Sequence, residues 1–177
     1  MSLLQLGELE AAEDAITQAN ILDNTNPTVW GLNCLLCLKY GSQRITQARF
    51  CLNNAVQLGI REVDLISQIG ELFEQLGMFT ETMQVYALVP TIDPNNGEII
   101  ERLGYLYCNE ENPLKDKDAS VDCLKRAVEL VKGETNKTNI VQTLQALLLS
   151  MNREFELNPY LKYLPDAGGV EGHDDFE

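Results

Sequence analysis

The chain of 177 residues is long enough for one ordinary domain, and its apolar share of 45% predicts a packed core rather than general disorder. Its formal net charge of −14 makes nucleic acid and anionic membrane poor partners for the chain as a whole. A basic or amphipathic protein segment is a better partner, and the alternative is that the charge serves solubility alone.

The longest apolar runs fall far short of the ~18 to 20 residues that a membrane span needs. The first ten residues carry no basic region and soon become acidic, which is not the pattern of a secretory signal. We therefore expect an intracellular, cytoplasmic protein whose five cysteines are reduced thiols.

Apolar residues recur three and four positions apart along most of the chain, which predicts a series of short amphipathic helices. The expected helices span residues 3–21, 28–40, 46–58, 63–76, 80–89, 98–108, 119–131 and 138–155. Pro27, Gly41, Gly59, Gly77 and the turn 93–97 separate them. Strand-like alternation appears nowhere, so the expected fold class is all-α.

The last predicted helix is followed by a segment of different character. Residues 165–177 hold five acids and no Lys or Arg, and we predict an extended acidic tail over 156–177.

The last predicted helix has more leucines than one of its faces can hold, namely Leu144, Leu147, Leu148 and Leu149. Either residues 160–164 fold back over them, or a partner covers them.

The strongest signal is a repeated spacing of about thirty-four residues. The unit 63–96 contains Ile69-Gly70, Phe73, Gly77, Tyr86 and Pro94. The unit 97–133 contains Leu103-Gly104, Tyr107 and Ala127, and the unit 27–60 contains Trp30, Cys34, Gly41, Ala48 and Ala55. This pattern resembles the tetratricopeptide repeat family, with two extra residues between Gly41 and Ala48 and about four in the turn before Ser120.

The resemblance implies a right-handed α-solenoid of helix-turn-helix repeats with a C-terminal capping helix. The repeat domain would cover residues 1–155, as a half repeat 3–22, the three repeats above and a cap at 138–155. Because the first helix fits the second half of a repeat, we expect either a fragment of a longer array or an end that another chain covers.

A second resemblance covers residues 8–78. The segments 26–30 (NPTVW), 37–39 (CLK) and 55–60 (AVQLGI) are similar to the repeat region of cilia- and flagella-associated proteins. This resemblance implies a ciliary, flagellar, axonemal or other cytoskeletal location.

Catalytic constellations are weak in this sequence. Cys34 and Cys37 have CxxC spacing, but both fall at packing positions of the repeat, and the single histidine, His173, lies in the tail. No phosphate-binding glycine motif occurs. We therefore predict a protein that is not an enzyme and binds no cofactor or metal. A thiol-dependent enzyme would need Cys34 or Cys37 to be exposed and reactive.

In the tetratricopeptide family the first helix of each repeat lines a concave surface. The resemblance places the following protein-binding groove residues on it: Leu35, Lys39, Asp64, Ser67, Glu71, Glu74, Glu98, Glu101, Tyr105 and Asn109. Gly31 and Leu38 fall on the same surface. Its acids favour a basic or amphipathic segment, and the alternative is a solvated acidic face.

These features predict a non-enzymatic protein–protein interaction scaffold with several protein partners, as a structural component of a large assembly. The alternative is a soluble adaptor or co-chaperone that captures one basic or amphipathic peptide in the groove.

Overall fold

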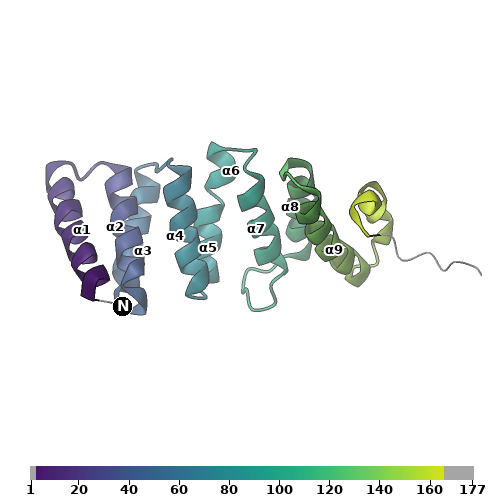
Figure 1. The fold of residues 1–177 in the computed structure, drawn as a ribbon, viewed down its shortest axis with the longest axis horizontal. Helices are drawn as coiled ribbons and strands as arrows, with labels where there is room; N and C mark the ends of the chain where they lie inside the picture. Colours follow the sequence, from purple (N-terminus) through teal and green to yellow (C-terminus); the bar gives the residue numbers. More distant parts are fainter. Residues whose placement is uncertain (1–2, 166–177) are drawn as a thin grey trace, which may run out of the picture.

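The structure is a computed structural model that describes residues 3–165, with side-chain surroundings from residue 7 onward. Within that range it is an elongated row of antiparallel helices without strands (Figure 1), which confirms the all-α solenoid. The helices are α1 (Leu3–Leu22), α2 (Pro27–Lys39), η1 (Gly41–Arg44), α3 (Ile45–Gln57), α4 (Val63–Gln75), α5 (Phe79–Tyr86), α6 (Val89–Ile92), α7 (Gly97–Cys108), α8 (Lys117–Leu130), α9 (Glu134–Ser150) and η2 (Glu154–Tyr163). No helix in this part of the chain is both long and apolar enough to cross a membrane.

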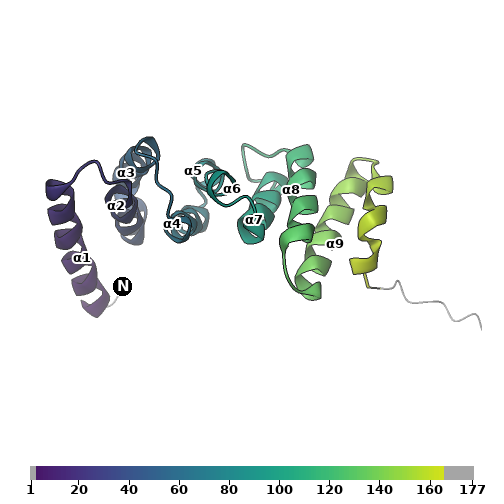
Figure 2. The ribbon, with the colours of Figure 1, turned by 90° about the horizontal axis from the view of Figure 1, so that it is seen from above.

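Successive helix pairs place α2, α4 and α7 along one side of the molecule and α3 and α5 along the other (Figure 2). The helix starts follow local rules. The Asn26 side chain accepts a hydrogen bond from the backbone N–H of Thr28 at 3.0 Å, and Asn96 accepts one from Ile99 at 3.1 Å. After α4, Gly77 adopts a φ of +69°, a left-handed conformation that favours glycine.

Small residues allow neighbouring helices to approach closely, as the repeat pattern predicts. A Cβ at Gly70 would lie 2.2 Å from Cε1 of Tyr86, and a Cβ at Gly104 would lie 2.6 Å from Cδ2 of Leu124. Gly31 serves the same purpose, because its Cβ would lie 2.6 Å from Cδ1 of Ile60. The prediction that Gly31 and Leu38 lie on the groove surface is therefore wrong, because both residues are buried between helices.

Among the described residues, the buried apolar side chains form two clusters rather than one. The first extends from Cys34 to Leu106, and the second from Ile100 to Leu157. Helix α7 contributes to both, with Leu103 in the first cluster and Ile100 in the second. Helix α7 therefore connects the two clusters, and Cys123 of α8 also packs against both.

Several predicted helix bounds differ from the observed ones for local reasons. The helix expected over 80–89 is divided into α5 and α6, because Pro90 has no N–H to donate and its ring would clash with the carbonyl one turn earlier. The short 3₁₀ helix η1 accommodates the two residues inserted after Gly41. Helix α9 spans Glu134–Ser150 rather than 138–155, and Asn152 follows it with a φ of +54°.

The segment after α9 folds back on the leucine-rich helix, which was one of the two expected arrangements. Residues 154–163 form the 3₁₀ helix η2, and Leu157 is buried in the second cluster. The extended conformation predicted from residue 156 is therefore wrong as far as residue 163. The acid-rich segment 166–177, which also contains His173, lies outside the described residues.

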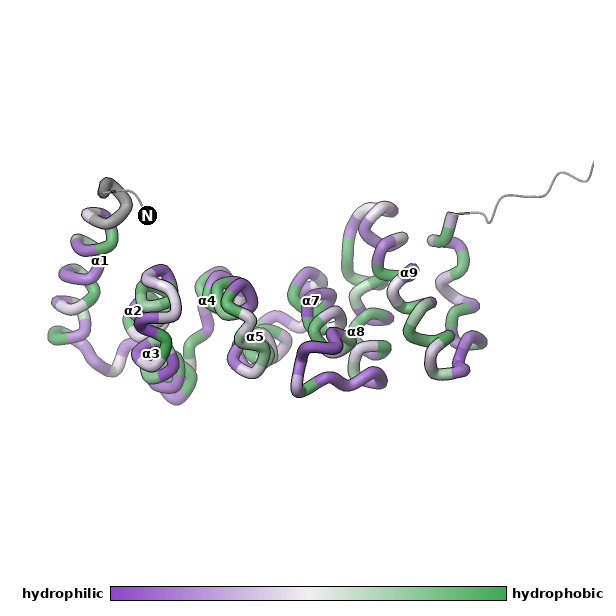
Figure 3. Tube along the Cα trace, turned by 90° about the horizontal axis from the view of Figure 1, so that it is seen from below, coloured by the Kyte–Doolittle hydropathy of each residue, from purple (hydrophilic) through white to green (hydrophobic). Residues whose placement is uncertain are grey.

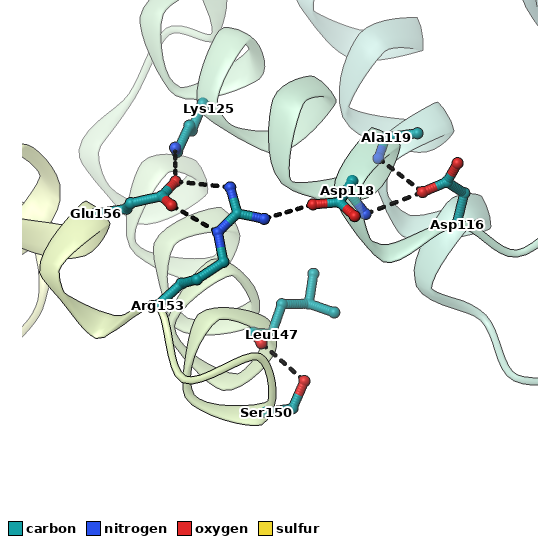
Figure 4. Close-up of polar contacts among 8 residues, drawn as sticks. All are labelled: Asp116, Asp118, Ala119, Lys125, Leu147, Ser150, Arg153 and Glu156. Atoms are coloured by element: carbon teal, nitrogen blue, oxygen red, sulfur yellow. Dashed lines mark hydrogen bonds and ion pairs between the residues drawn. The ribbon is translucent and has the colours of Figure 1, made fainter.

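Ion pairs fasten η2 to α8 (Figure 4). Arg153 pairs with Asp118 and, through Nε at 2.6 Å, with Glu156. Glu156 also accepts a hydrogen bond from Nζ of Lys125 at 2.5 Å. Hydrogen bonds from Arg153 and Lys125 lower the pKa of Glu156 to about 2. Asp116 caps α8 nearby by accepting from the backbone N–H groups of Asp118 and Ala119.

Candidate functional site

The side of the molecule formed by α2, α4 and α7 is the expected groove. Seen from below (Figure 3), α1 at one end and the α8–α9 pair at the other extend beyond the row of these three helices. The predicted groove residues Asp64, Lys39 and Glu98 are exposed. The remaining predicted residues are half-buried: Leu35, Ser67, Glu71, Glu74, Glu101, Tyr105 and Asn109.

Four of the ten predicted residues line one cavity of about 370 Å³ between α4 and α7. These are Asp64, Ser67, Glu71 and Glu98, joined by the unpredicted Val63, Gln68, Asn96 and Ile99. We call this the α4–α7 cavity. Three of its eight lining residues are acids and none is basic, so its potential is negative.

An adjacent cavity of about 340 Å³ is lined by Glu71, Glu74, Gln75 and Arg102. Arg102 was not predicted as a groove residue, although its position four residues after Glu98 on one helix was a usable signal. Its guanidinium lies 3.1 Å from Glu71 and 3.5 Å from Glu98, and 3.9 Å from Glu74. Part of the predicted negative charge is therefore neutralised within the chain.

Tyr86 supports this arrangement from the neighbouring helix α5. Its hydroxyl donates to Oε2 of Glu74 at 3.2 Å and accepts from Nη1 of Arg102 at 3.1 Å. Burial raises the pKa of Tyr86 to about 12, so the phenol stays protonated at neutral pH. Glu74 and Arg102 are thus held in fixed positions on the groove side.

The other predicted residues do not join the α4–α7 cavity. Tyr105 packs against the second cluster, and burial raises its pKa to about 12. Burial raises the pKa of Glu101. Leu35 and Lys39 belong to α2, and Asn109 is the C-cap of α7.

A further cavity of about 480 Å³ lies at the other end of the stack, and sequence reasoning did not predict it. We call it the α1 cavity. It is lined by Glu13, Thr17, Trp30, Asn33, Cys37, Arg44, Thr46, Gln47, Phe50 and Cys51. The Trp30 and Phe50 rings meet edge to face at 5.8 Å. Arg44 donates to Glu13 at 2.7 Å, which ties α1 to the following repeat.

The CxxC cysteines sit where the repeat pattern places packing residues. Cys34 and Cys37 are both buried, as is Cys51. Burial raises the pKa of Cys34 to about 12. A hydrogen bond from Cys51 lowers the pKa of Cys37, and Arg44 adds to this effect against the opposing influence of burial. Among the described residues, no group of three or more His, Cys, Asp or Glu side chains is arranged to hold a metal ion.

The helix pairs, the glycine contacts and the groove side define a tetratricopeptide-type solenoid, a class that typically serves as a non-enzymatic scaffold for protein binding. Residues 1–143 match the family described as the cilia and flagella-associated protein 70 C-terminal domain, with its tetratricopeptide repeats. The chain belongs to this family.

Two curated relatives carry the name cilia- and flagella-associated protein 70, from Homo sapiens and Macaca fascicularis. Each is 37% identical over 73 residues, which is 41% of this chain. The matched region spans only 6% of the human protein and 7% of the macaque protein.

Solved structures of MamA show the same fold. A crystal structure of MamA superposes with a TM-score of 0.61 at 12% identity, covering 90% of this chain and 82% of that one. A structure of MamA AMB-1 gives 0.59 at 19% identity, covering 89% and 88%. At such low identity the likeness concerns the fold alone.

Proposed function

We propose that this chain is a non-enzymatic scaffold that binds other proteins as a structural component of a ciliary or axonemal assembly. The observation that carries the proposal is the α4–α7 cavity, in which Asp64, Glu71 and Glu98 from two repeats face one space. The cavity would hold a basic or amphipathic segment of a partner.

The charge balance of the groove side supports a basic partner. Arg102 is surrounded by Glu71, Glu74 and Glu98, so a single cation faces three carboxylates. Asp64 adds a fourth acid on the cavity wall. A Lys or Arg side chain entering the cavity would meet the excess negative charge, while Val63 and Ile99 offer apolar contact to its aliphatic stem.

The ciliary part of the proposal rests on the family. Both curated relatives are named as cilia- and flagella-associated, and both are far longer than the region matched here. Repeat solenoids present extended surfaces on which several partners can bind at once, which suits a component of a large assembly.

A charge-reversal experiment in ciliated cells tests both parts. Tagged wild type and an Asp64→Lys/Glu98→Lys double variant would be extracted with detergent and then with high salt. We expect the wild type to stay with the axonemal fraction after detergent, and the double variant to be released. The matched control is Asp122→Lys/Glu129→Lys, because both acids are exposed on α8, which lines neither of the two cavities on the groove side.

Equal retention of the two double variants would exclude the α4–α7 cavity as the attachment site. Release of the wild type by detergent alone would favour the alternative function, a soluble adaptor or co-chaperone that captures a basic or amphipathic peptide. In that case the same variants would be compared for binding of a lysine-rich amphipathic peptide at low and high salt, since screening weakens a charge-driven complex.

A further inference from the structure

Arg102 of α7 already occupies part of the acidic groove side. Its Nη2 lies 3.1 Å from Oε1 of Glu71 and 3.5 Å from Oε1 of Glu98. Its Nη1 lies 3.9 Å from Oε2 of Glu74. These carboxylates therefore hold a guanidinium within the folded chain, before any partner arrives.

The two cavities on the groove side follow one another along α4. Asp64 in the first turn of α4 and Glu98 in the first turn of α7 both line the α4–α7 cavity. Glu74 and Gln75, at the end of α4, line the adjacent cavity of about 340 Å³, which we call the Arg102 cavity. Glu71 lines both. A partner segment that lies along α4 would therefore place one side chain in each cavity, about one to two helical turns apart.

The two cavities offer different charges to a partner. The α4–α7 cavity has Asp64, Glu71 and Glu98 in its wall and no base. In the Arg102 cavity, Glu71 and Glu74 share their space with Arg102 itself. Once a partner's base in the first cavity pairs with Glu71, the remaining charges of Glu74 and Arg102 cancel. A second base would gain little there, because repulsion from Arg102 offsets its attraction to Glu74.

Tyr86 keeps Arg102 in its cavity. The Nη1 group of Arg102 donates a hydrogen bond to the Tyr86 hydroxyl at 3.1 Å, and the Tyr86 side chain is 0% exposed. The Arg102 side chain is itself only 33% exposed. The guanidinium is thus attached to the body of the solenoid, and an incoming base meets it as a fixed positive charge.

We propose that Arg102 is the specificity-determining residue of the groove side, and that it limits the groove to partner segments with one isolated basic side chain. The base enters the α4–α7 cavity, and an uncharged side chain one or two helical turns away enters the Arg102 cavity. This inference rests on the proposed function, because it concerns the partner of the same site.

Two other kinds of segment are disfavoured. A segment with regularly spaced bases, which the net charge of −14 alone would favour, would bring its second base against Arg102. A segment with a carboxylate in the second position would bring it against Glu71 and Glu74. The specificity of the groove thus comes from repulsion as well as attraction.

The test selects binders from a display library of short peptides that are randomised at every position. The folded wild type and the Arg102→Gln variant are the two targets. Each pool is counter-selected against the same target carrying Asp64→Lys/Glu98→Lys, so that only peptides that need the α4–α7 cavity remain. We expect wild-type binders to share one Lys or Arg, with uncharged residues one and two helical turns away. Binders of Arg102→Gln should carry a second base at those positions.

The affinity of one wild-type binder then measures the effect. A second Lys, introduced one or two helical turns from the base, should raise the affinity for Arg102→Gln about threefold or more and give no gain with the wild type. Glu74→Gln should shift the result in the opposite direction, because it leaves Arg102 unopposed in its cavity, so the second Lys should weaken binding. Arg49→Gln is the matched control, since it breaks the ion pair of Arg49 with Glu81 between α3 and α5 and should behave as the wild type.

The failures of this inference and of the proposed function are distinguishable. If no peptide survives counter-selection, or if the survivors carry no base, the basic partner of the α4–α7 cavity is wrong and this inference falls with it. If basic binders are recovered but the wild type and Arg102→Gln select the same motif, Arg102 does not set the specificity and the proposed function stands. Equal effects of the second Lys on the wild type, Arg102→Gln and Glu74→Gln would overturn the inference in the same way.

Discussion

Gly70 shows how closely two helices approach in this solenoid. The Tyr86 ring occupies the space where a side chain would begin, and that ring is 0% exposed and held by Glu74 and Arg102. The repeat pattern predicted a small residue here, because that requirement is local and recurs in each unit. The partners of the ring were not predicted, since Arg102 reaches it from the next repeat.

Gly70→Ala tests this contact. The added methyl group would lie 2.2 Å from the Tyr86 ring, so the ring or the helix must shift. Overpacking typically costs about 1 to 3 kcal/mol, and the close contact of this Cβ with the ring places the cost in the upper half of that range, above the gain in helix propensity of up to about 1 kcal/mol. We expect a net loss of about 1 to 2 kcal/mol in urea unfolding. Gly7→Ala is the control, because its Cβ meets nothing within 4 Å, and a loss of equal size there would contradict the explanation.

At the scale of the element, η2 shows a limit of sequence reasoning. Pro159 lies within this helix, and the composition from residue 156 onward suggested an extended tail, with a fold-back of residues 160–164 as one of two alternatives. The structure orders them through tertiary contacts, the burial of Leu157 and the ion pairs of Arg153. Apolar periodicity predicts helices that bury a continuous face, and it misses segments held by a few anchors.

The anchoring of η2 through one buried leucine predicts that a Leu→Ala substitution costs different amounts of folding stability at two positions of this helix. Leu157→Ala should cost at least about 2 kcal/mol, because the side chain is 6% exposed and leaves a cavity against α9. Leu161→Ala should cost no more than about 0.5 kcal/mol, since half of that side chain is already exposed. Thermal or urea unfolding measures both, and equal losses would mean that Leu157 is not the anchor.

The ion pairs of η2 predict a dependence of stability on pH. The folded-state pKa of Glu156 lies at about 2, below its ordinary value of 4.5, because Arg153 and Lys125 stabilise the carboxylate. The contribution of the Glu156 carboxylate to folding stability is therefore fully present above about pH 4.5 and is lost as the pH falls toward about 2. We expect Glu156→Gln to be less stable than the wild type at about pH 6, with the difference shrinking by about pH 3.

The control for this titration is Glu154→Gln, because Glu154 is exposed at the start of the same helix and lies outside the ion-pair network. Urea unfolding of both variants at each pH separates Glu156 from the general effect of protonating the other acids. A difference between wild type and Glu156→Gln that stays constant with pH would show that the carboxylate is not stabilised by its partners.

At the scale of the whole molecule, the repeat spacing predicted the architecture because each unit contains the same local signals. The cavities depend on pairs of residues from different helices, and the repeat spacing does not specify which residues occupy those positions. The α1 cavity is lined by Glu13 and Arg44, which lie 31 residues apart, and by Cys37 of α2 together with Cys51 of α3. Part of the lining of the α4–α7 cavity was predicted, since Asp64 and Glu98 occupy equivalent positions in successive repeats.

The division of the core into two clusters predicts how the stack unfolds. In a solenoid each repeat contacts only its neighbours. A substitution that destabilises one repeat should therefore affect distant repeats only through the interfaces between neighbouring repeats. Helix α7 joins the clusters through Leu103 on one side and Ile100 on the other. Leu144→Ala in the second cluster should therefore lower the hydrogen-exchange protection of α8 and α9 more than that of α2 and α3.

Leu52→Ala in the first cluster is the matched substitution, because Leu52 is 2% exposed and Leu144 is 0% exposed. It should show the reverse pattern, with protection lost mainly in α2 and α3 and less in α8 and α9. Helix α7 should respond to both variants, since it packs in both clusters. A uniform loss of hydrogen-exchange protection along the chain in both variants would contradict this prediction. It would show that the two clusters unfold together, so that the solenoid is one cooperative unit.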